Sequence, residues 1–459
     1  MVRFVNRERE LKRLAEWWAE PGARLGLVWG RRRVGKTALL QEFAKGKLVV
    51  FHTASSRPVA DELTVVSRHV GSSVQPAFRD LPSRPFRDWD DCFDTLAEIA
   101  RERPVLFVLD EFPELKTTSP ELESILRAFW DRARTKTHLR LLLCGSAVRT
   151  MAAIQEERAP LYGRFQISLR LDPFAPHEAA RMLPKLGPAD RALVWGLLGG
   201  VPLYLEWWDQ TRTIKQNLER LSCTPGGALL TEGDFVLATE GGGGELTRQV
   251  LHAVAAGRTK YNEIEQAVGT SPSRVIDNLI ELRLLERISP VTDMSRRTRR
   301  SSYRIADNFL AFWLGVVSKY RAEIDRWLGK TILNALVADL DDHMGPRWEE
   351  AFRQHLRRMV ARGDLGSDVV AVGSYWSDGR DPVEIDAVVL AGRSRKAILV
   401  GEAKWAKAMN GEGVLRSLKE KARRLPATAD ALVYTACARE KVSAAAGLRT
   451  FTARHIFSR

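Results

Sequence analysis

The sequence predicts an α/β protein that begins with a parallel sheet core and continues into smaller units. Short apolar runs at residues 24–29, 105–111 and 139–144 alternate with helical patterns, which indicates strands of a parallel sheet. Each run ends in glycine or polar residues, as parallel strands do where a sheet carries its ligand. The length of 459 residues exceeds the roughly 100 to 200 residues of one domain.

The predicted units follow one another along the chain. We expect a core domain at residues 1–171, a helical lid at 172–240, a winged-helix domain at 241–320 and a further α/β domain at 330–459. The glycine run at 241–244 marks the linker, because consecutive glycines do not hold regular structure.

The chain is basic overall. It has 71 Lys and Arg against 57 Asp and Glu, a formal net charge of +14. A positive charge of this size favours DNA or another nucleic acid as a partner. A solvated arginine-rich surface without such a partner is the alternative.

Cysteine usage and hydropathy indicate the compartment. The cysteines are far apart in sequence and lack the paired spacing of a metal site, so we expect reduced thiols and no structural zinc. The N-terminus has no signal-like apolar core, and no run of about 18 apolar residues occurs. We therefore expect a cytoplasmic protein that does not span a membrane. The cysteines are Cys92, Cys144, Cys223 and Cys437.

A phosphate-binding loop follows the first predicted strand. Residues 30–37 read GRRRVGKT and lead directly into a helical pattern. Glycines let backbone N–H groups face phosphates, Lys36 neutralises the β and γ oxygens, and the Thr37 hydroxyl binds magnesium. The pattern predicts an ATP and Mg²⁺ site rather than an ordinary glycine-rich turn. Its expected cofactor-binding residues are Gly30, Arg31, Arg32, Arg33, Val34, Gly35, Lys36, Thr37 and Ala38.

Two carboxylates end the second apolar run. Asp110 and Glu111 follow a strand too short to be a lone helix, at the edge where parallel strands present catalytic groups. Asp110 is expected to hold magnesium, and Glu111 to polarise the attacking water. An Asp-Glu pair after a strand is about as often a solvated strand end as a functional site. When it follows a phosphate loop in the sequence, it is expected to supply the carboxylates of the nucleotide site.

Two later residues are weaker candidates. Ser146 follows the third apolar run, where a hydroxyl would sense the γ-phosphate or merely cap the next helix. Arg164 lies in a glycine-containing turn and would act as an arginine finger toward a neighbouring subunit, or be an ordinary surface arginine.

The first half of the chain resembles the archaeal-type ATPase family, a branch of the P-loop NTPases close to the AAA+ and STAND groups. The resemblance rests on FVNRE at 4–8, GRRRVGKT at 30–37, VLDEF at 108–112, LCGS at 143–146, PLYGR at 160–164, LDPF at 171–174 and GGVPLYL at 199–205.

The resemblance implies further roles. It implies that the N-terminal segment clamps the adenine side, that Ser146 is a sensor, that Arg164 is a candidate arginine finger and that Pro202 contacts the nucleotide from the lid. The residues themselves indicate only a helix stop at 199–200 and a turn or a proline-started helix after it.

The middle of the chain predicts a winged helix. Apolar residues recur at helical spacing from 246 to 285, and two short alternating segments at 285–289 and 302–305 indicate a hairpin. The hairpin tip would lie on DNA phosphates, or be a solvated tip on a domain used for intramolecular contacts. The tip arginines are Arg296, Arg297, Arg299 and Arg300.

The last segment predicts a metal-dependent site. Alternation places Glu402 and Lys404 on one face of a strand, and pairing with the strand of Asp386 would bring the three together. Asp386 and Glu402 would bind Mg²⁺ or Mn²⁺, Lys404 would activate water, and Glu349 or Glu350 would complete the shell. This resembles the PD-(D/E)xK nuclease superfamily, a restriction-endonuclease-like fold, although Ile385 stands where the motif has proline.

Together these patterns predict an ATP-hydrolysing P-loop ATPase that acts on DNA through a winged helix and a nuclease-like domain. One alternative is a STAND-like regulatory switch whose inactive nuclease fold serves for binding. Another is a nucleic-acid binder that does not cleave. A homo-oligomer or a protein partner is compatible with each.

Overall fold

The computed structural model describes residues 4–74, 76, 78–239, 244–293, 300–378 and 381–458. The chain divides into two compact units, Met1–Asp172 and Pro173–Arg459, which are described separately here. The predicted boundaries at 240 and 320 fall inside the second unit and stay predictions.

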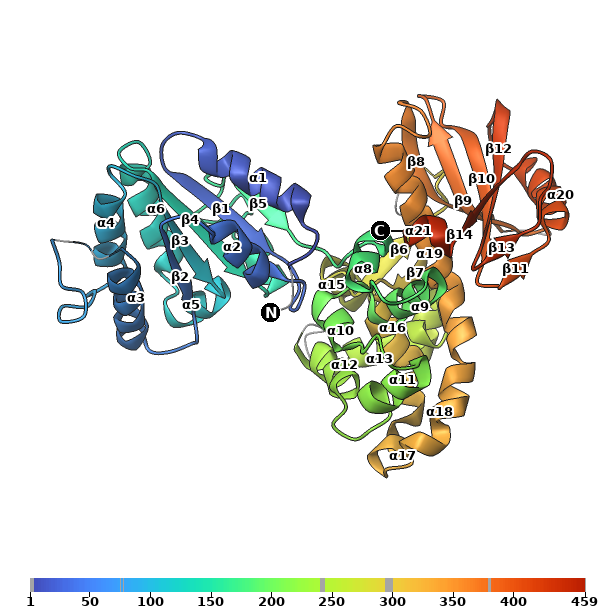
Figure 1. The fold of residues 1–459 in the computed structure, drawn as a ribbon, viewed down its shortest axis with the longest axis horizontal. Helices are drawn as coiled ribbons and strands as arrows, with labels where there is room; N and C mark the ends of the chain where they lie inside the picture. The colour runs from blue at the N-terminus through green and yellow to red at the C-terminus, as the bar shows by residue number, and fades with distance from the viewer. Residues whose placement is uncertain are drawn as a thin grey trace. The chain divides into compact units, whose positions relative to one another are not determined.

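The first unit is built on a five-stranded parallel sheet with the order β2-β3-β4-β1-β5 (Figure 1). Every residue of β3 and β4 is buried, which explains why these strands are continuous apolar runs rather than alternating ones. The predicted parallel α/β core is therefore confirmed. The strands are β1 (Arg24–Trp29), β2 (Val49–Thr53), β3 (Val105–Asp110), β4 (Leu139–Gly145) and β5 (Ile167–Arg170).

Helices cover both faces of this sheet. One face packs under α1 and α2 through Trp17, Leu40 and Phe43. The other packs under α3, α4 and α6, where Phe93 and Phe129 stack with ring centroids 5.3 Å apart. The helices are α1 (Glu8–Ala19), α2 (Lys36–Ala44), α3 (Val59–Val74), α4 (Trp89–Ile99), α5 (Phe112–Thr118), α6 (Leu122–Ala133) and α7 (Val148–Ala153).

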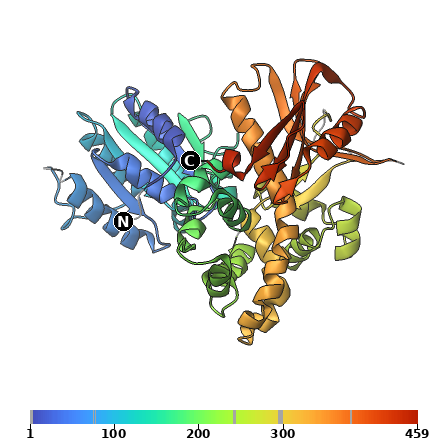
Figure 2. The same ribbon diagram turned by 45° about the vertical axis from the view of Figure 1, so that its right-hand side comes forward.

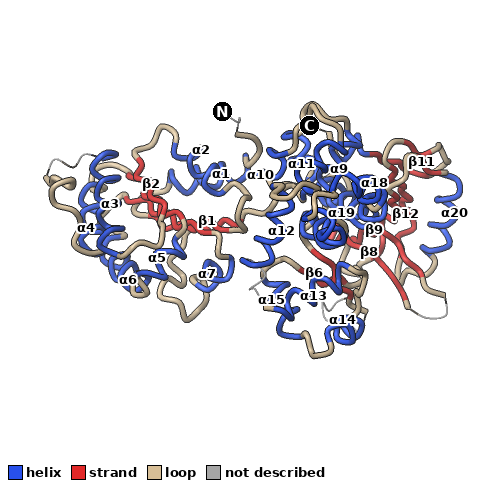
Figure 3. The backbone as a smooth tube through the Cα atoms, turned by 90° about the horizontal axis from the view of Figure 1, so that it is seen from below, coloured by secondary structure: helices blue, strands red, loops and turns tan. Residues whose placement is uncertain are grey.

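The second unit begins with helices, which Figure 3 labels α9 to α12. Helix α9 ends at Gly199, which has a φ of 69°, and Pro202 is the first residue of α10. A Cβ on Gly200 would lie 2.0 Å from the Phe174 carbonyl oxygen, so only glycine fits there. The helix stop and proline-started helix are as predicted. These helices are α8 (Pro176–Met182), α9 (Pro188–Leu198), α10 (Pro202–Trp207), α11 (Ile214–Ser222) and α12 (Ala228–Thr239).

Three helices and a hairpin come next, in the order that the sequence predicts. Strands β6 and β7 pair antiparallel, with Leu285 opposite Ile305. Residues 241–243 of the predicted linker and Arg296, Arg297 and Arg299 of the hairpin tip lie outside the described residues. The elements are α13 (Glu245–Ala255), α14 (Tyr261–Val268), α15 (Ser273–Glu281), β6 (Leu285–Ile288) and β7 (Ser302–Ile305).

Helices connect the hairpin to a mixed C-terminal sheet, seen as the orange and red strands in Figure 2. Its strand order is β14-β12-β10-β9-β8. Strands β8, β9 and β10 pair antiparallel, and β10, β12 and β14 pair parallel. The elements are α16 (Asn308–Gly315), α17 (Arg321–Asp325), α18 (Gly329–Ala338), α19 (Leu340–Ala361), β8 (Val369–Ser377), β9 (Val383–Ala391), β10 (Lys396–Lys404), β11 (Ala408–Met409), α20 (Gly411–Ala422), β12 (Thr428–Ala438), β13 (Lys441–Val442), β14 (Leu448–Thr452) and α21 (Ala453–Ile456), with a 3-10 turn at Val317–Tyr320.

The mixed sheet has a helix on each face. Helix α19 covers one face, where Phe352 lies against Gly401. Helix α20 covers the other through Leu418 and Ala422. The four cysteines are buried free thiols. Within the described residues, no helix combines the length and apolar character needed to cross a membrane.

A partly buried ion network joins the hairpin to α19 inside the second unit. Arg304 on β7 pairs with Glu286 at 2.7 Å and with Glu350 at 3.0 Å. Glu350 also accepts from Arg353 at 3.0 Å and Arg357 at 2.7 Å. Burial disfavours the charged carboxylate, but the arginines hold the pKa of Glu350 below its usual value.

Replacing Arg304 by methionine is expected to lower the free energy of unfolding of the second unit by about 3 kcal/mol, because partly buried carboxylates lose a counter-charge. Chemical denaturation followed by fluorescence measures this. Arg321 pairs with Asp234 and Asp325 at the surface, so Arg321→Met is the control, with an expected loss below about 1 kcal/mol. Equal losses in both variants would show that the network stabilises the second unit no more than a surface ion pair does.

His343 on α19 is buried and packs against α9. Its Nε2–H donates to the Gly196 carbonyl at 3.0 Å, which fixes the neutral tautomer. Burial, and then the nearby Arg347, lowers the pKa of His343 to about 3. Because the unfolded chain takes up this proton near pH 6.5, the contribution of His343 to stability is lost as pH falls from about 6.5 toward 3.

Lowering the pH from 7 to 5 is expected to cost the wild-type second unit about 2 kcal/mol more than it costs His343→Gln, which has no titrating ring. Denaturation curves of both proteins at the two pH values give this difference. If the two proteins lose the same stability, the histidine is not neutral in the folded state.

Candidate functional site

The predicted phosphate loop connects β1 to α2. Gly30 has a φ of 148°, and a Cβ there would lie 2.3 Å from the Leu171 carbonyl oxygen. Arg33 and Gly35 also have positive φ values, 69° and 88°, and curl the chain into the start of α2. No side chain caps α2 at its N-cap residue Gly35, so the helix start presents its N–H groups to an anion.

Lys36 lies across this loop. The side chain is buried, and Nζ donates to the Gly30 carbonyl at 3.0 Å and the Arg31 carbonyl at 2.9 Å. Of the other predicted loop residues, Arg31, Arg32, Arg33 and Val34 lie between β1 and α2, and Ala38 is in the first turn of α2.

The Arg7 side chain stabilises the loop through hydrogen bonds that sequence reasoning did not identify. Its guanidinium donates to the Val34 carbonyl at 3.0 Å and to the Asp172 carbonyl at 2.7 Å. Asn6 and Arg7 both have positive φ, a strained conformation for side-chain-bearing residues. The only available signal was the polar FVNRE segment itself.

The structure brings Thr37 and Asp110 together. The Thr37 hydroxyl donates to Asp110 Oδ2 at 2.9 Å, and Asp110 is buried at the end of β3. A hydroxyl and a carboxylate are the hard oxygen donors that Mg²⁺ prefers. The donor set therefore fits magnesium beside the phosphate loop.

Glu111 and Ser146 also meet at this sheet edge. The Ser146 hydroxyl contacts both carboxylate oxygens of Glu111, at 2.8 and 2.7 Å, and its backbone N–H donates at 3.3 Å. Glu111 caps α5 with a φ of 54°, which turns its side chain out of the line of β3. The adjacent parallel strands β3 and β4 place the two residues at neighbouring strand ends.

Arg164 and Pro202 are the remaining predicted contacts of the nucleotide. Arg164 forms a two-pronged pair with Asp131 of the same unit, at 3.0 and 2.8 Å. An arginine-finger role would require this pair to open. Pro202 starts α10 in the second unit.

The C-terminal sheet brings Glu402, Lys404 and Asp386 together. Lys404 Nζ lies 3.0 Å from Glu402 and 3.8 Å from Asp386. The Ala403 N–H donates to Asp386 Oδ2 at 2.8 Å. Lys421 of α20, which sequence reasoning missed, lies 2.8 Å from Glu402. In the sequence, only the run of basic residues in this helix pointed to Lys421.

The structure distinguishes Glu349 from Glu350. Glu350 is committed to the arginine network of Arg304. Glu349 lies 3.6 Å from Arg353, and burial and then the nearby charge of Asp386 raise its pKa to about 7. Burial and then Glu402 raise the pKa of Asp386 to about 6. Glu349 is therefore the one of the two glutamates whose pKa the charge of Asp386 raises.

The carboxylate oxygens of this cluster are of the ligand type that Mg²⁺ and Mn²⁺ prefer. In the described part of the chain, however, no three His, Cys, Asp or Glu side chains are close enough to hold a metal ion. Instead, Lys404 and Lys421 form ion pairs with Glu402. A cation would have to displace these lysines.

A glycine-rich loop between β1 and α2, with Lys36, Thr37 and Asp110 beside it, defines a P-loop ATPase. Residues 4–207 match the model of an ATPase domain found predominantly in Archaea. This part of the chain therefore belongs to that ATPase family. Residues 313–421 match archaeal and bacterial proteins of unknown function.

Individual relatives agree with this assignment. An uncharacterized protein of Methanocaldococcus jannaschii is 26% identical over 411 residues, 88% of this chain and 87% of that protein. An uncharacterized ATP-binding protein of the same organism is 47% identical over 49 residues, 11% of this chain and 83% of that protein. The Walker-type ATPase of Pyrococcus abyssi has a TM-score of 0.50 at 19% identity, covering 68% of this chain and 96% of that one. This last likeness concerns the fold.

Proposed function

We propose that the first unit binds Mg²⁺ and ATP at the phosphate loop and hydrolyses ATP with Glu111 as the water-activating residue. The observation that carries this proposal is the Thr37–Asp110 contact of 2.9 Å beside the uncapped start of α2. It joins the two predicted magnesium ligands, which lie 73 residues apart in sequence.

In the proposed reaction, loop N–H groups and Lys36 bind the phosphates of ATP. Lys36 must exchange its contacts with the Gly30 and Arg31 carbonyls for phosphate oxygens. Thr37 and Asp110 would hold Mg²⁺, which supplies charge neutralisation at the transferred phosphoryl group. Glu111 accepts a proton from the attacking water after its carboxylate leaves Ser146.

We further propose that the second unit acts on DNA through Asp386, Glu402, Glu349 and Lys404. Two carboxylates beside the Lys404 ammonium, with Glu349 acting on them electrostatically, are the chemistry that supports phosphodiester hydrolysis once a cation displaces the lysines. The net charge of +14 supports a polyanionic substrate. The four buried free thiols fit action in a reducing compartment such as the cytoplasm.

The hairpin has a separate role in this proposal. The Val291 N–H donates to the Ser374 carbonyl at 2.8 Å, and Arg395 donates to the Val291 carbonyl at 2.9 Å. Arg300 pairs with Asp293. These contacts support a hairpin docked on β8 that transmits changes to the C-terminal sheet; DNA contact by the tip arginines stays a prediction.

One experiment tests the DNA proposal. Supercoiled, linear and branched DNA are incubated with wild type and Lys36→Ala, with Mg²⁺ or Mn²⁺, and with or without ATP. We expect metal-dependent cleavage that ATP changes in wild type and not in Lys36→Ala. Salt-sensitive DNA binding without cleavage would support a binder.

A regulatory switch is the second candidate function. It is favoured by the engagement of Glu111 with Ser146 and of Arg164 with Asp131, since both groups are held away from a reaction. A switch turns ATP over slowly and retains nucleotide, whereas a DNA-acting motor turns over fast and is stimulated by DNA. No cleavage under any condition, together with retained nucleotide after desalting, would decide for the switch. An arginine finger, in which Arg164 reaches the nucleotide of a neighbouring subunit, is compatible with both the motor and the switch.

A further inference from the structure

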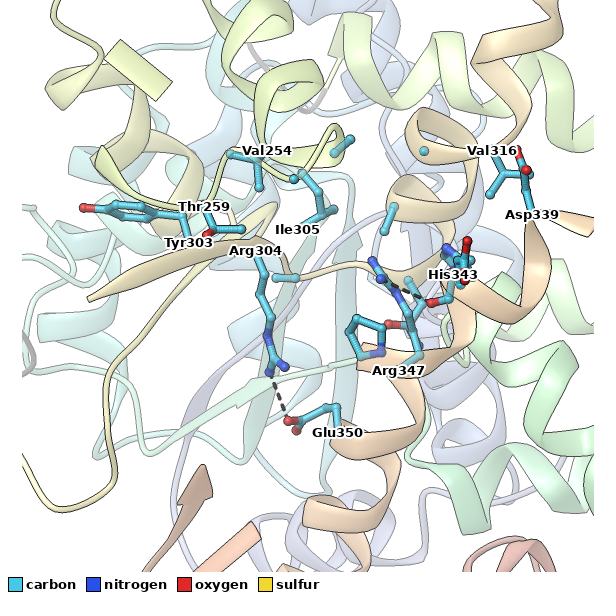
Figure 4. A pocket seen from close by; sticks show the side chains of 18 of the residues that line it. Val254, Thr259, Tyr303, Arg304, Ile305, Val316, Asp339, His343, Arg347 and Glu350 are labelled. Atoms are coloured by element: carbon cyan, nitrogen blue, oxygen red, sulfur yellow. Dashed lines mark hydrogen bonds and ion pairs between the residues drawn. The ribbon is translucent and has the colours of Figure 1, made fainter. Parts of the chain in front are cut away.

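A cavity of about 360 Å³ lies inside the second unit, between β7, α16 and α19. Figure 4 shows the Arg347 side chain extending from α19 into this space. The size is within the range of small-molecule sites in proteins. The cavity includes none of the residues assigned above to ATP or to the Asp386 cluster.

Arg347 brings a positive charge to the cavity, and the carboxylates that act on it, Asp307 and Glu349, do so from beyond ion-pair distance. Its guanidinium donates a long hydrogen bond, 3.4 Å, to the His343 carbonyl. Among the residues that the structure describes, no carboxylate oxygen lies within 4.0 Å of its guanidinium. Burial, and then the neighbouring Arg304, lowers the pKa of Arg347 to about 10. The surroundings therefore disfavour the cation that an arginine must carry.

The acidic side chains of the wall do not supply a direct counter-charge to Arg347. Glu350 accepts from Arg304, Arg353 and Arg357. Asp339 pairs with Lys319 at 3.1 Å, and Asp342 is exposed. An anion bound in the cavity would therefore give Arg347 the direct ion pair that the wall does not supply.

The rest of the wall is suited to an organic body. Val254, Ile305 and Val316 line the cavity with apolar surface, and Ala311 leaves room beside them. We propose that this cavity binds a small organic anion, with its oxyanion group paired to the Arg347 guanidinium and its apolar body against Val254, Ile305 and Val316. Arginine binds carboxylates and phosphates alike through two parallel hydrogen bonds. This inference is independent of the proposed ATPase and nuclease functions.

Calorimetric titration with three ring compounds tests the site. Benzoate carries a carboxylate, phenyl phosphate carries a phosphate, and benzamide is the uncharged counterpart of benzoate. We expect wild type to bind benzoate or phenyl phosphate and to bind benzamide at least about tenfold more weakly, since the charge-assisted pair is then missing. Which of the two anions binds tells the carboxylate and phosphate chemistries apart.

Two variants locate the binding. Arg347→Gln removes the charge, and Ala311→Leu keeps the charge but fills the cavity; each is expected to weaken anion binding about tenfold or more. Arg362→Gln, at the exposed end of α19, is the charge-matched control and should bind like wild type. The proposal is overturned if neither anion binds wild type, if benzamide binds as well as benzoate, or if both cavity variants keep wild-type affinity. The wild-type titrations decide the question even if a variant fails to fold.

Discussion

Replacing Glu111 by glutamine is expected to lower ATP turnover by about 10²-fold or more while leaving ATP affinity within a few fold of wild type. The amide cannot accept a proton from the attacking water, yet it preserves the size of the side chain. It also keeps a hydrogen-bonding partner for the Ser146 hydroxyl. Steady-state phosphate release and equilibrium binding of labelled ATP measure the two quantities.

Glu157→Gln is the matched control for this prediction, because Glu157 is exposed in the same unit and has no role in the proposed site. Its turnover should equal that of wild type. A Glu111→Gln protein with full turnover would remove Glu111 from the mechanism. A loss of ATP binding equal to the loss of turnover would assign Glu111 a structural role instead.

Replacing Lys404 by alanine is expected to lower metal-dependent DNA cleavage by about 10² to 10³-fold, because it removes the ammonium that lies near both Asp386 and Glu402. Lys421 lies beside Glu402 and leaves a residual rate. ATP turnover by the first unit should stay at the wild-type level. Gel-based cleavage of a supercoiled plasmid gives the rate.

The control for Lys404 is Lys407→Ala, since Lys407 is on the same segment, is 74% exposed and only reaches Glu440 at 3.9 Å. It should cleave like wild type. If both lysine variants lose the same activity, the effect is one of general basic charge on DNA binding. Asp386→Asn should then be no worse than Lys407→Ala, contrary to a catalytic cluster.

The sheet core could be predicted from the sequence because its strands are buried on both faces. The continuous apolar run of β3 and its terminal Asp110 follow directly from that burial. The phosphate loop could be predicted because phosphate binding restricts both residue type and spacing. In the C-terminal sheet, alternation was enough to bring Glu402 and Lys404 to one face.

Other features depend on contacts that no local pattern encodes. Glu349 and Glu350 are neighbours on α19, and only the tertiary structure shows that Arg304 of β7 pairs with Glu350. The pairing of Arg164 with Asp131 joins residues 33 positions apart. The cavity around Arg347 needs β7, α16 and α19 to come together. Such features follow from tertiary packing rather than from periodicity.

The most direct test of the account is the rate of ATP hydrolysis by wild type and by Lys36→Ala, measured with Mg²⁺ and again after chelation. Lys36 is the residue that the account places on the β and γ phosphates. We predict Mg²⁺-dependent release of phosphate by wild type and loss of about 10²-fold or more in Lys36→Ala. Equal rates in the two proteins, or a rate that chelation leaves unchanged, would contradict ATP hydrolysis at this loop.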